Sequence, residues 1–105
     1  MSFDEILTKV RTMASAVTPS PSDFLAVQVN LENEGVFYVE VKDGKVNVEP
    51  YEYNDRHCAI TMKPDNFVKL LDGELDPIKA FTFGKLKVDG DVGKALEFSK
   101  LVKKA

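Results

Sequence analysis

The first seventeen residues carry apolar side chains at helical spacing. Ser2 and Glu5 are spaced as a capping box, in which each side chain accepts a hydrogen bond from the other residue's backbone N–H. The segment Thr18-Pro19-Ser20-Pro21 then ends the helix, because proline and the residue before it disfavour helical backbone angles. The spacing predicts a helix over residues 3–17, with an apolar face made by Phe3, Ile6, Leu7, Val10, Met13, Ala14 and Val17.

Residues 24–62 switch to the two-residue alternation that is typical of half-buried strands. Strands are predicted at residues 24–31 and 36–41, each with its apolar side chains on one face. Asp43-Gly44 follows and marks a tight hairpin, because that turn needs positive φ angles. The remaining pattern predicts a third strand at Val46 and Val48, a polar loop over residues 51–56 and a fourth strand over residues 57–62.

The second half of the chain predicts three helices and one more strand. The segments 64–73 and 77–84 each open with a proline and end with a glycine, as short helices often do. Residues 86–88 form a short apolar alternation and predict a fifth strand. Asp91 then caps a final helix whose apolar face comprises Val92, Ala95, Leu96, Phe98, Leu101 and Val102.

This order of elements favours an α+β domain of two layers. Three successive strands joined by tight turns should pair antiparallel, and one side of the sheet is clearly more apolar than the other. We therefore expect a five-stranded, mostly antiparallel sheet covered on one side by helices. At 105 residues the chain is expected to form one domain over its whole length.

Charge is distributed unevenly along the chain. Residues 1–78 hold 7 basic and 14 acidic side chains, whereas residues 79–105 hold 7 basic and 3 acidic ones. The acidic body argues against a nucleic-acid partner, because phosphate binding needs a concentrated basic surface. Lys100, Lys103 and Lys104 suit the C-terminal end of a helix dipole, and transient contact with an anionic membrane surface is the alternative interpretation.

The sequence offers no case for an enzyme. His57 and Cys58 are neighbours, but adjacent side chains of a strand point to opposite faces and cannot form a nucleophile–base pair. We expect an exposed or capping histidine and a small buried cysteine instead. One histidine and one cysteine also give too few ligands for a metal site, so neither a metal nor a cofactor is expected.

The sequence contains no targeting or membrane signal that we recognise. No apolar run approaches the roughly 18 residues of a membrane span, and acidic residues occupy the place of a signal peptide's basic start. The chain ends in Lys-Lys-Ala rather than a peroxisomal Ser-Lys-Leu type signal. A lone cysteine fits a reducing compartment, so a cytoplasmic location is expected.

Residues 65–96 carry a family resemblance. The stretch DNFVKLLDGELDPIKAFTFGKLKVDGDVGKAL resembles the second half of a sterol carrier protein 2 domain. The matching features are an apolar helix ending in Gly73, a proline-led segment running into Ala80-Phe81, the strand Gly84-Lys85-Leu86-Lys87, and a glycine turn before Ala95-Leu96. The preceding strands fit the order of the family but carry less specific residues.

The resemblance implies an apolar tunnel between sheet and helices that binds a hydrophobic small molecule without chemistry. Members of the family bind fatty acids, fatty acyl-coenzyme A, phospholipids or sterols. Phe83 stands where members with a lipid tunnel often carry glutamine, which favours a plain apolar lining or a filled pocket and an acyl chain over a sterol. The expected walls are Met62, Phe67, Leu71, Leu75, Ile78, Phe81, Phe83 and Leu86, with Leu101 and Val102 at the lid.

Two other interpretations stay open from the sequence. The outer sheet face, with Phe24, Val36 and Tyr38, could dock a protein partner or a second copy over a filled core, although a monomer or weak dimer is expected. A small hydrolase using His57 would need a nucleophile that the sequence does not provide. Gly84 is expected to cap a helix, and a hinge at the mouth of the tunnel is its alternative role.

Overall fold

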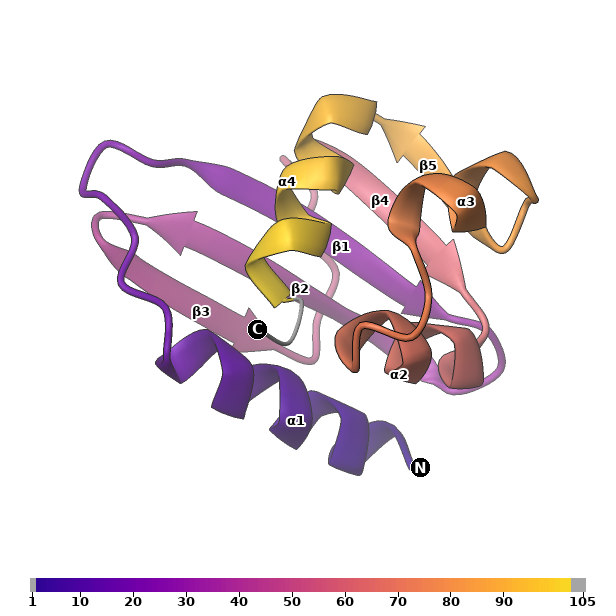
Figure 1. The fold of residues 1–105 in the computed structure, drawn as a ribbon. Coiled ribbons are helices and arrows are strands. Elements are labelled where there is room, and N and C mark those ends of the chain that lie inside the picture. Colours follow the sequence, from indigo (N-terminus) through magenta and orange to yellow (C-terminus); the bar gives the residue numbers. More distant parts are fainter. Residues whose placement is uncertain (1, 103–105) are drawn as a thin grey trace.

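A computed structural model describes residues 2–102 as one sheet covered by helices (Figure 1). The elements follow the predicted order: α1 (Phe3–Ser15), β1 (Leu25–Leu31), β2 (Gly35–Lys42), β3 (Lys45–Glu49), β4 (Cys58–Met62), α2 (Pro64–Leu71), α3 (Pro77–Thr82), β5 (Leu86–Gly90) and α4 (Val92–Val102).

The sheet has five strands in the order β3-β2-β1-β4-β5. Pairing is antiparallel between β1 and β2, between β2 and β3, and between β4 and β5, whereas β1 and β4 run parallel. The predicted five-stranded, mostly antiparallel sheet is therefore confirmed, and the parallel pair at its centre makes it mixed. The connection from β3 to β4 passes over the outer face, where the backbone N–H of Tyr53 donates to the Gln28 side chain of β1 (3.1 Å).

The helices lie on one face of the sheet (Figure 1). Within that layer, α4 packs over β1 and β4, α1 packs against β3, and α3 packs against β5. The core forms between the layers from the inward strand positions, and on β1 these alternate with outward Gln28 and Asn30 as predicted. Its largest fully buried members are Phe37, Phe67, Phe98, Ile6, Ile60, Met62, Leu70 and Leu71.

Local sequence signals set both ends of α1. The capping box is present, with the Glu5 N–H donating to Ser2 Oγ (3.2 Å) and the Ser2 N–H donating to Glu5 Oε1 (3.0 Å). The helix ends at Ser15, two residues before the predicted end, because Ala16 already serves as its C-cap. Within residues 2–102, no helix combines the length and the apolar character needed to cross a membrane.

Candidate ligand pocket

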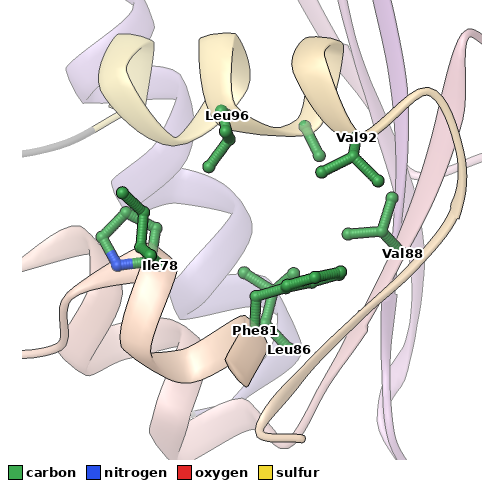
Figure 2. A pocket seen from close by; sticks show the side chains of 8 residues that line it. Ile78, Phe81, Leu86, Val88, Val92 and Leu96 are labelled. Carbon is green, nitrogen blue, oxygen red and sulfur yellow. The ribbon is translucent and has the colours of Figure 1, made fainter. Parts of the chain in front are cut away.

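An apolar pocket opens between α3, α4 and β5, at the edge of the sheet (Figure 2). Its volume is about 70 Å³, which exceeds the roughly 15 Å³ that a single water molecule requires. All the lining residues are apolar: Pro77, Ile78, Phe81, Leu86, Val88, Val92, Ala95 and Leu96.

Helix α3 forms one wall and is only lightly anchored. Ala80 is its single buried residue, whereas Ile78 is 63% exposed and Phe81 is 44% exposed. Asp76 is the N-cap of the helix, and its carboxylate accepts hydrogen bonds from the backbone N–H groups of residues 78 and 79. Because so little of α3 is buried, little apolar packing opposes its movement away from the sheet.

The end of α3 is set by Gly84. Its N–H donates to the Phe81 carbonyl (3.2 Å), and the Lys85 N–H donates to the Ala80 carbonyl (2.8 Å). With the φ of Gly84 at 76°, these bonds form a Schellman motif, which confirms the predicted helix cap. The turn then directs the chain into β5, where it forms the floor of the pocket.

The other walls come from β5 and α4. Leu86 and Val88 are two residues apart on the edge strand β5, so both side chains point toward the helical layer. Val92, Ala95 and Leu96 are spaced at i, i+3 and i+4, which places them on one face of α4. In Figure 2 the side chains from α4 point across the pocket toward those of α3.

The chemistry of this pocket is limited to apolar contact. None of its eight lining residues has an ionisable or nucleophilic side chain. Such a surface can bind hydrocarbon, because removing apolar area from water is favourable and requires no hydrogen-bonding partner.

The structure places the predicted wall residues in three different environments. Ile78, Phe81 and Leu86 line the pocket. Phe83 lies outside it with 76% of its surface exposed, and Leu101 lines a separate surface depression beside Phe24. The remaining predicted residues belong to the core or pack against it: Met62, Phe67, Leu71, Leu75 and Val102.

Five lining residues were absent from the predicted set: Pro77, Val88, Val92, Ala95 and Leu96. The three from α4 had been recognised as members of one apolar helix face. Helical spacing identifies such a face but does not say whether its neighbour is a filled core or an open pocket. Only the position of α3 above the edge strand decides that.

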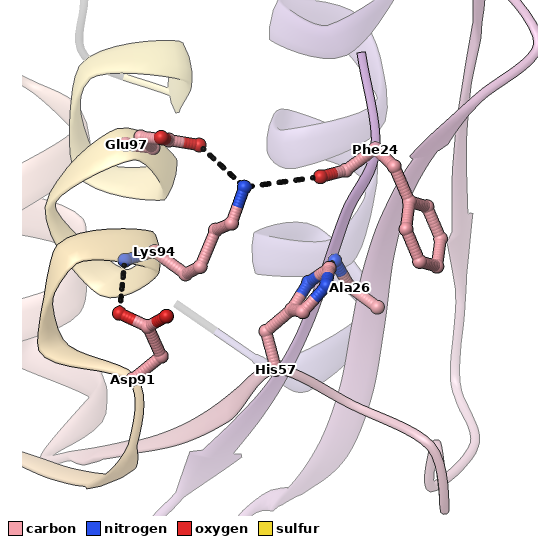
Figure 3. A network of polar contacts seen from close by, with 6 residues as sticks. All are labelled: Phe24, Ala26, His57, Asp91, Lys94 and Glu97. Carbon is pink, nitrogen blue, oxygen red and sulfur yellow. Dashed lines mark hydrogen bonds and ion pairs between the residues drawn. The ribbon is translucent and has the colours of Figure 1, made fainter. Parts of the chain in front are cut away.

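His57 and Cys58 do not form a catalytic pair. His57 Nδ1 accepts a hydrogen bond from the backbone N–H of Ala26 (3.0 Å), and its ring lies edge-on to Phe24 at 4.9 Å between ring centroids (Figure 3). Cys58 is 1% exposed on the opposite side, and burial raises the pKa of its thiol to about 11. The thiol is therefore protonated at neutral pH. Among the described residues, no three potential ligands are grouped as a metal ion requires.

A polar network ties the start of α4 to the start of β1 (Figure 3). Asp91 caps the helix by accepting from the backbone N–H of Lys94 (3.1 Å). The ammonium group of Lys94 donates to the Phe24 carbonyl (3.3 Å) and lies 3.4 Å from a carboxylate oxygen of Glu97. This network holds the α4 wall of the pocket in place against the sheet.

The outer face of the sheet is polar. The Gln28 amide donates to Asn30 (2.9 Å), and the Asn30 amide donates to Thr61 (3.3 Å). Tyr53 donates to Glu40 at 2.6 Å, so the β3–β4 connection covers part of this face. A docking surface made of Phe24, Val36 and Tyr38 is therefore not favoured, because hydrogen-bonded polar groups separate the apolar ones.

Comparison with known proteins gives the family. Residues 8–103 match the model of the SCP-2 sterol transfer family. The chain belongs to this family. A similar curated relative is the human sterol carrier protein 2, which is 38% identical over 68 residues. That match covers 65% of this chain but only 12% of the human protein.

Solved structures share the fold at low sequence identity. The solution structure of palmitated SCP2L2 from Aedes aegypti has a TM-score of 0.71 at 16% identity, covering 99% of this chain and 96% of that one. A stereoselective inverting sec-alkylsulfatase from a Pseudomonas species has a TM-score of 0.69 at 17% identity. This second likeness covers 78% of this chain and 13% of the sulfatase.

Proposed function

We propose that this chain binds the hydrocarbon part of a lipid in the pocket between α3, α4 and β5 and carries it without chemical change. The observation that carries this proposal is a recess lined entirely by apolar residues in a member of the SCP-2 sterol transfer family. The palmitated relative with the same fold supports an acyl chain as the ligand. No lining residue could act as acid, base or nucleophile, so the proposal includes no chemical step.

Burial of hydrocarbon supplies enough free energy for such binding. An acyl chain of about 16 methylenes yields roughly 13 kcal/mol when fully buried, at about 0.8 kcal/mol each. Association and ordering cost on the order of 4–15 kcal/mol, so a micromolar dissociation constant needs no ion pair with a head group. The proposal therefore agrees with a pocket that has no charged wall.

Occupation requires the pocket to open further. Sites for small ligands typically enclose about 300–1,000 Å³, whereas this recess encloses about 70 Å³. Helix α3 has a single buried residue and is flanked by Gly73 and Gly84, both with left-handed φ angles. We expect α3 to move outward when an acyl chain enters, extending the recess toward the core residues Phe67 and Leu71.

A titration with a fluorescent fatty acid tests the proposal. Wild-type protein should bind with micromolar affinity, and Val92→Trp should weaken binding by about tenfold because the indole fills the mouth of the pocket. Val92 is 41% exposed, so the larger side chain can be accommodated without unfolding the protein. Circular dichroism and thermal unfolding of the variant verify this.

The matched control is Val36→Trp, on the outer face of β2. It makes the same substitution far from the pocket and should leave the affinity unchanged. Equal loss of affinity in both variants, or no saturable binding by the wild type, contradicts the proposal.

A further inference from the structure

Helix α3 and the turn after it expose large apolar side chains to solvent. Phe83 is 76% exposed, Ile78 is 63% exposed and Phe81 is 44% exposed, although they are close together in sequence. Helix α1 behaves differently, since Ile6 and Val10 on its apolar face are fully buried against the sheet. The apolar side chains of α3 therefore form a surface that the folded chain leaves uncovered.

Lys79 and Lys85 lie close in sequence to these apolar side chains, and Asp76 at the start of α3 is the acidic residue beside them. Lys79 lies on α3 and Lys85 directly follows Gly84, and both are exposed. Lys63 and Lys87 line a shallow depression together with Lys85, and Glu32 is the acidic residue of that depression. Within residues 2–102, none of these four lysines takes part in an ion pair. Three lysines against one carboxylate leave the depression with an excess of positive charge, next to exposed Phe83.

We propose that this region is a docking surface for a bilayer containing anionic lipids. The docking surface consists of Ile78, Phe81 and Phe83 with Lys79 and Lys85. Apolar side chains that insert at the acyl boundary and lysines that pair with anionic head groups are the two contributions that hold a peripheral protein on a membrane. Lys79 and Lys85 belong to residues 79–105, which hold 7 basic and 3 acidic side chains.

The docking surface is continuous with the ligand pocket. Ile78 and Phe81 belong to both, and Val92, also exposed, completes the mouth between α3 and α4 (Figure 2). A docked protein would hold this mouth against the acyl region, so a chain could pass between bilayer and pocket without crossing water. This last step rests on the proposed function, whereas docking itself does not.

A second copy of the chain is a poorer occupant. In a two-fold symmetric dimer the same patch serves both partners, so Lys79 and Lys85 of one copy would approach the same lysines of the other. Like charges brought together in this way oppose association. An anionic bilayer satisfies both the apolar and the basic side chains.

Co-sedimentation with vesicles tests the proposal. The full chain should partition to phosphatidylcholine vesicles containing about 30% phosphatidylserine more strongly than to pure phosphatidylcholine vesicles, and added salt should weaken the binding. The double variant Lys79→Glu/Lys85→Glu should lower the partition coefficient at least tenfold, and Phe83→Ser should lower it about tenfold.

Matched controls lie elsewhere on the molecule. Lys42→Glu/Lys45→Glu makes the same charge change in the hairpin of β2 and β3, at the opposite edge of the sheet from β5. Tyr51→Ser removes an aromatic ring that is 64% exposed. Both should bind anionic vesicles within about twofold of the wild type. Losses equal to those of the docking-surface variants, or no preference of the wild type for anionic vesicles, would overturn the proposal.

Two further measurements separate docking from its alternatives. Fatty-acid binding in vesicle-free solution should be unchanged by Lys79→Glu/Lys85→Glu. If the wild type binds vesicles but no fatty acid, docking is supported and the proposed function is contradicted. Sedimentation equilibrium tests whether a second copy of the chain occupies the docking surface. The docking proposal would be overturned if the wild type formed a dimer that Phe83→Ser disrupts and did not bind vesicles.

Discussion

Gly84 and Gly90 position the backbone around the pocket, and glycine is required at these two sites for different physical reasons. Gly84 has a φ of 76°, and a Cβ placed there would meet no heavy atom within 4 Å beyond its chain neighbours, so only backbone conformation demands glycine. Gly90 has a φ of 112°, and a Cβ would lie 2.6 Å from the His57 carbonyl oxygen and 3.0 Å from Cys58 Cα. Gly90 thus permits the close approach of β5 to β4 that holds the pocket floor.

Replacing each glycine by alanine should separate these two effects. Gly84→Ala should lower the free energy of unfolding by about 1 kcal/mol, the cost of a left-handed conformation for a residue with a Cβ. Gly90→Ala should lower it by about 3 kcal/mol or more, because backbone atoms must also move. Urea denaturation measures both values, and a smaller loss for Gly90→Ala than for Gly84→Ala would contradict this explanation.

The residue scale is also where sequence prediction of the site was least informative. Phe67, Phe81 and Phe83 are chemically identical, but the first is fully buried in the core, the second lines the pocket and the third faces solvent. Side-chain type and local spacing give the same expectation for all three. Their environments differ because α2 packs against the core with three buried residues, whereas α3 contributes only Ala80.

At the scale of elements, prediction was more successful because local signals define helices and strands. The capping box of α1, the Asp43-Gly44 hairpin and the glycines after α2 and α3 each determine a boundary through backbone conformation. The β3–β4 connection was expected only as a polar loop. Its contacts with the sheet depend on residues distant in sequence, since Tyr53 bonds to Glu40 and its ring lies 5.1 Å from that of Tyr38.

This connection should make stability sensitive to alkaline pH. The hydrogen bond to Glu40, followed by burial, raises the pKa of Tyr53 from its usual 10 to about 12, so folding favours the protonated phenol. Its contribution is fully present below pH 10 and is lost as the pH rises from about 10 to 12. Burial likewise raises the pKa of Tyr38 and that of Cys58, which act in the same direction.

Tyr53→Phe isolates that contribution. At pH 8 the variant should be about 1 kcal/mol less stable than the wild type, because the Glu40 carboxylate loses a hydrogen bond. The difference should shrink by pH 11, because Tyr53 of the unfolded wild type, with its usual pKa of about 10, is then mostly deprotonated, which favours unfolding. Urea denaturation at both pH values measures this, and a constant difference would show that the phenol proton contributes nothing.

At the scale of the whole molecule, the sheet and the helical layer leave the pocket at one edge. β5 is an edge strand, and α3 and α4 pack against it. The core at the centre of the sheet is covered more completely and is closed. The sequence pattern predicted both layers. It did not predict the parallel pairing of β1 with β4, which places β5 at the edge, because two other strands lie between β1 and β4 in the sequence.

The central claim is that a hydrocarbon chain lies between α3, α4 and β5. Methyl NMR with a fatty acid that carries a nitroxide near its terminal methyl group tests this most directly. Bound ligand should broaden the methyl signals of Leu86, Val88 and Leu96 and leave those of Val46 and Val48 on β3 intact. Undiminished signals from the pocket methyls at saturating ligand, or equal broadening on β3, would contradict the claim.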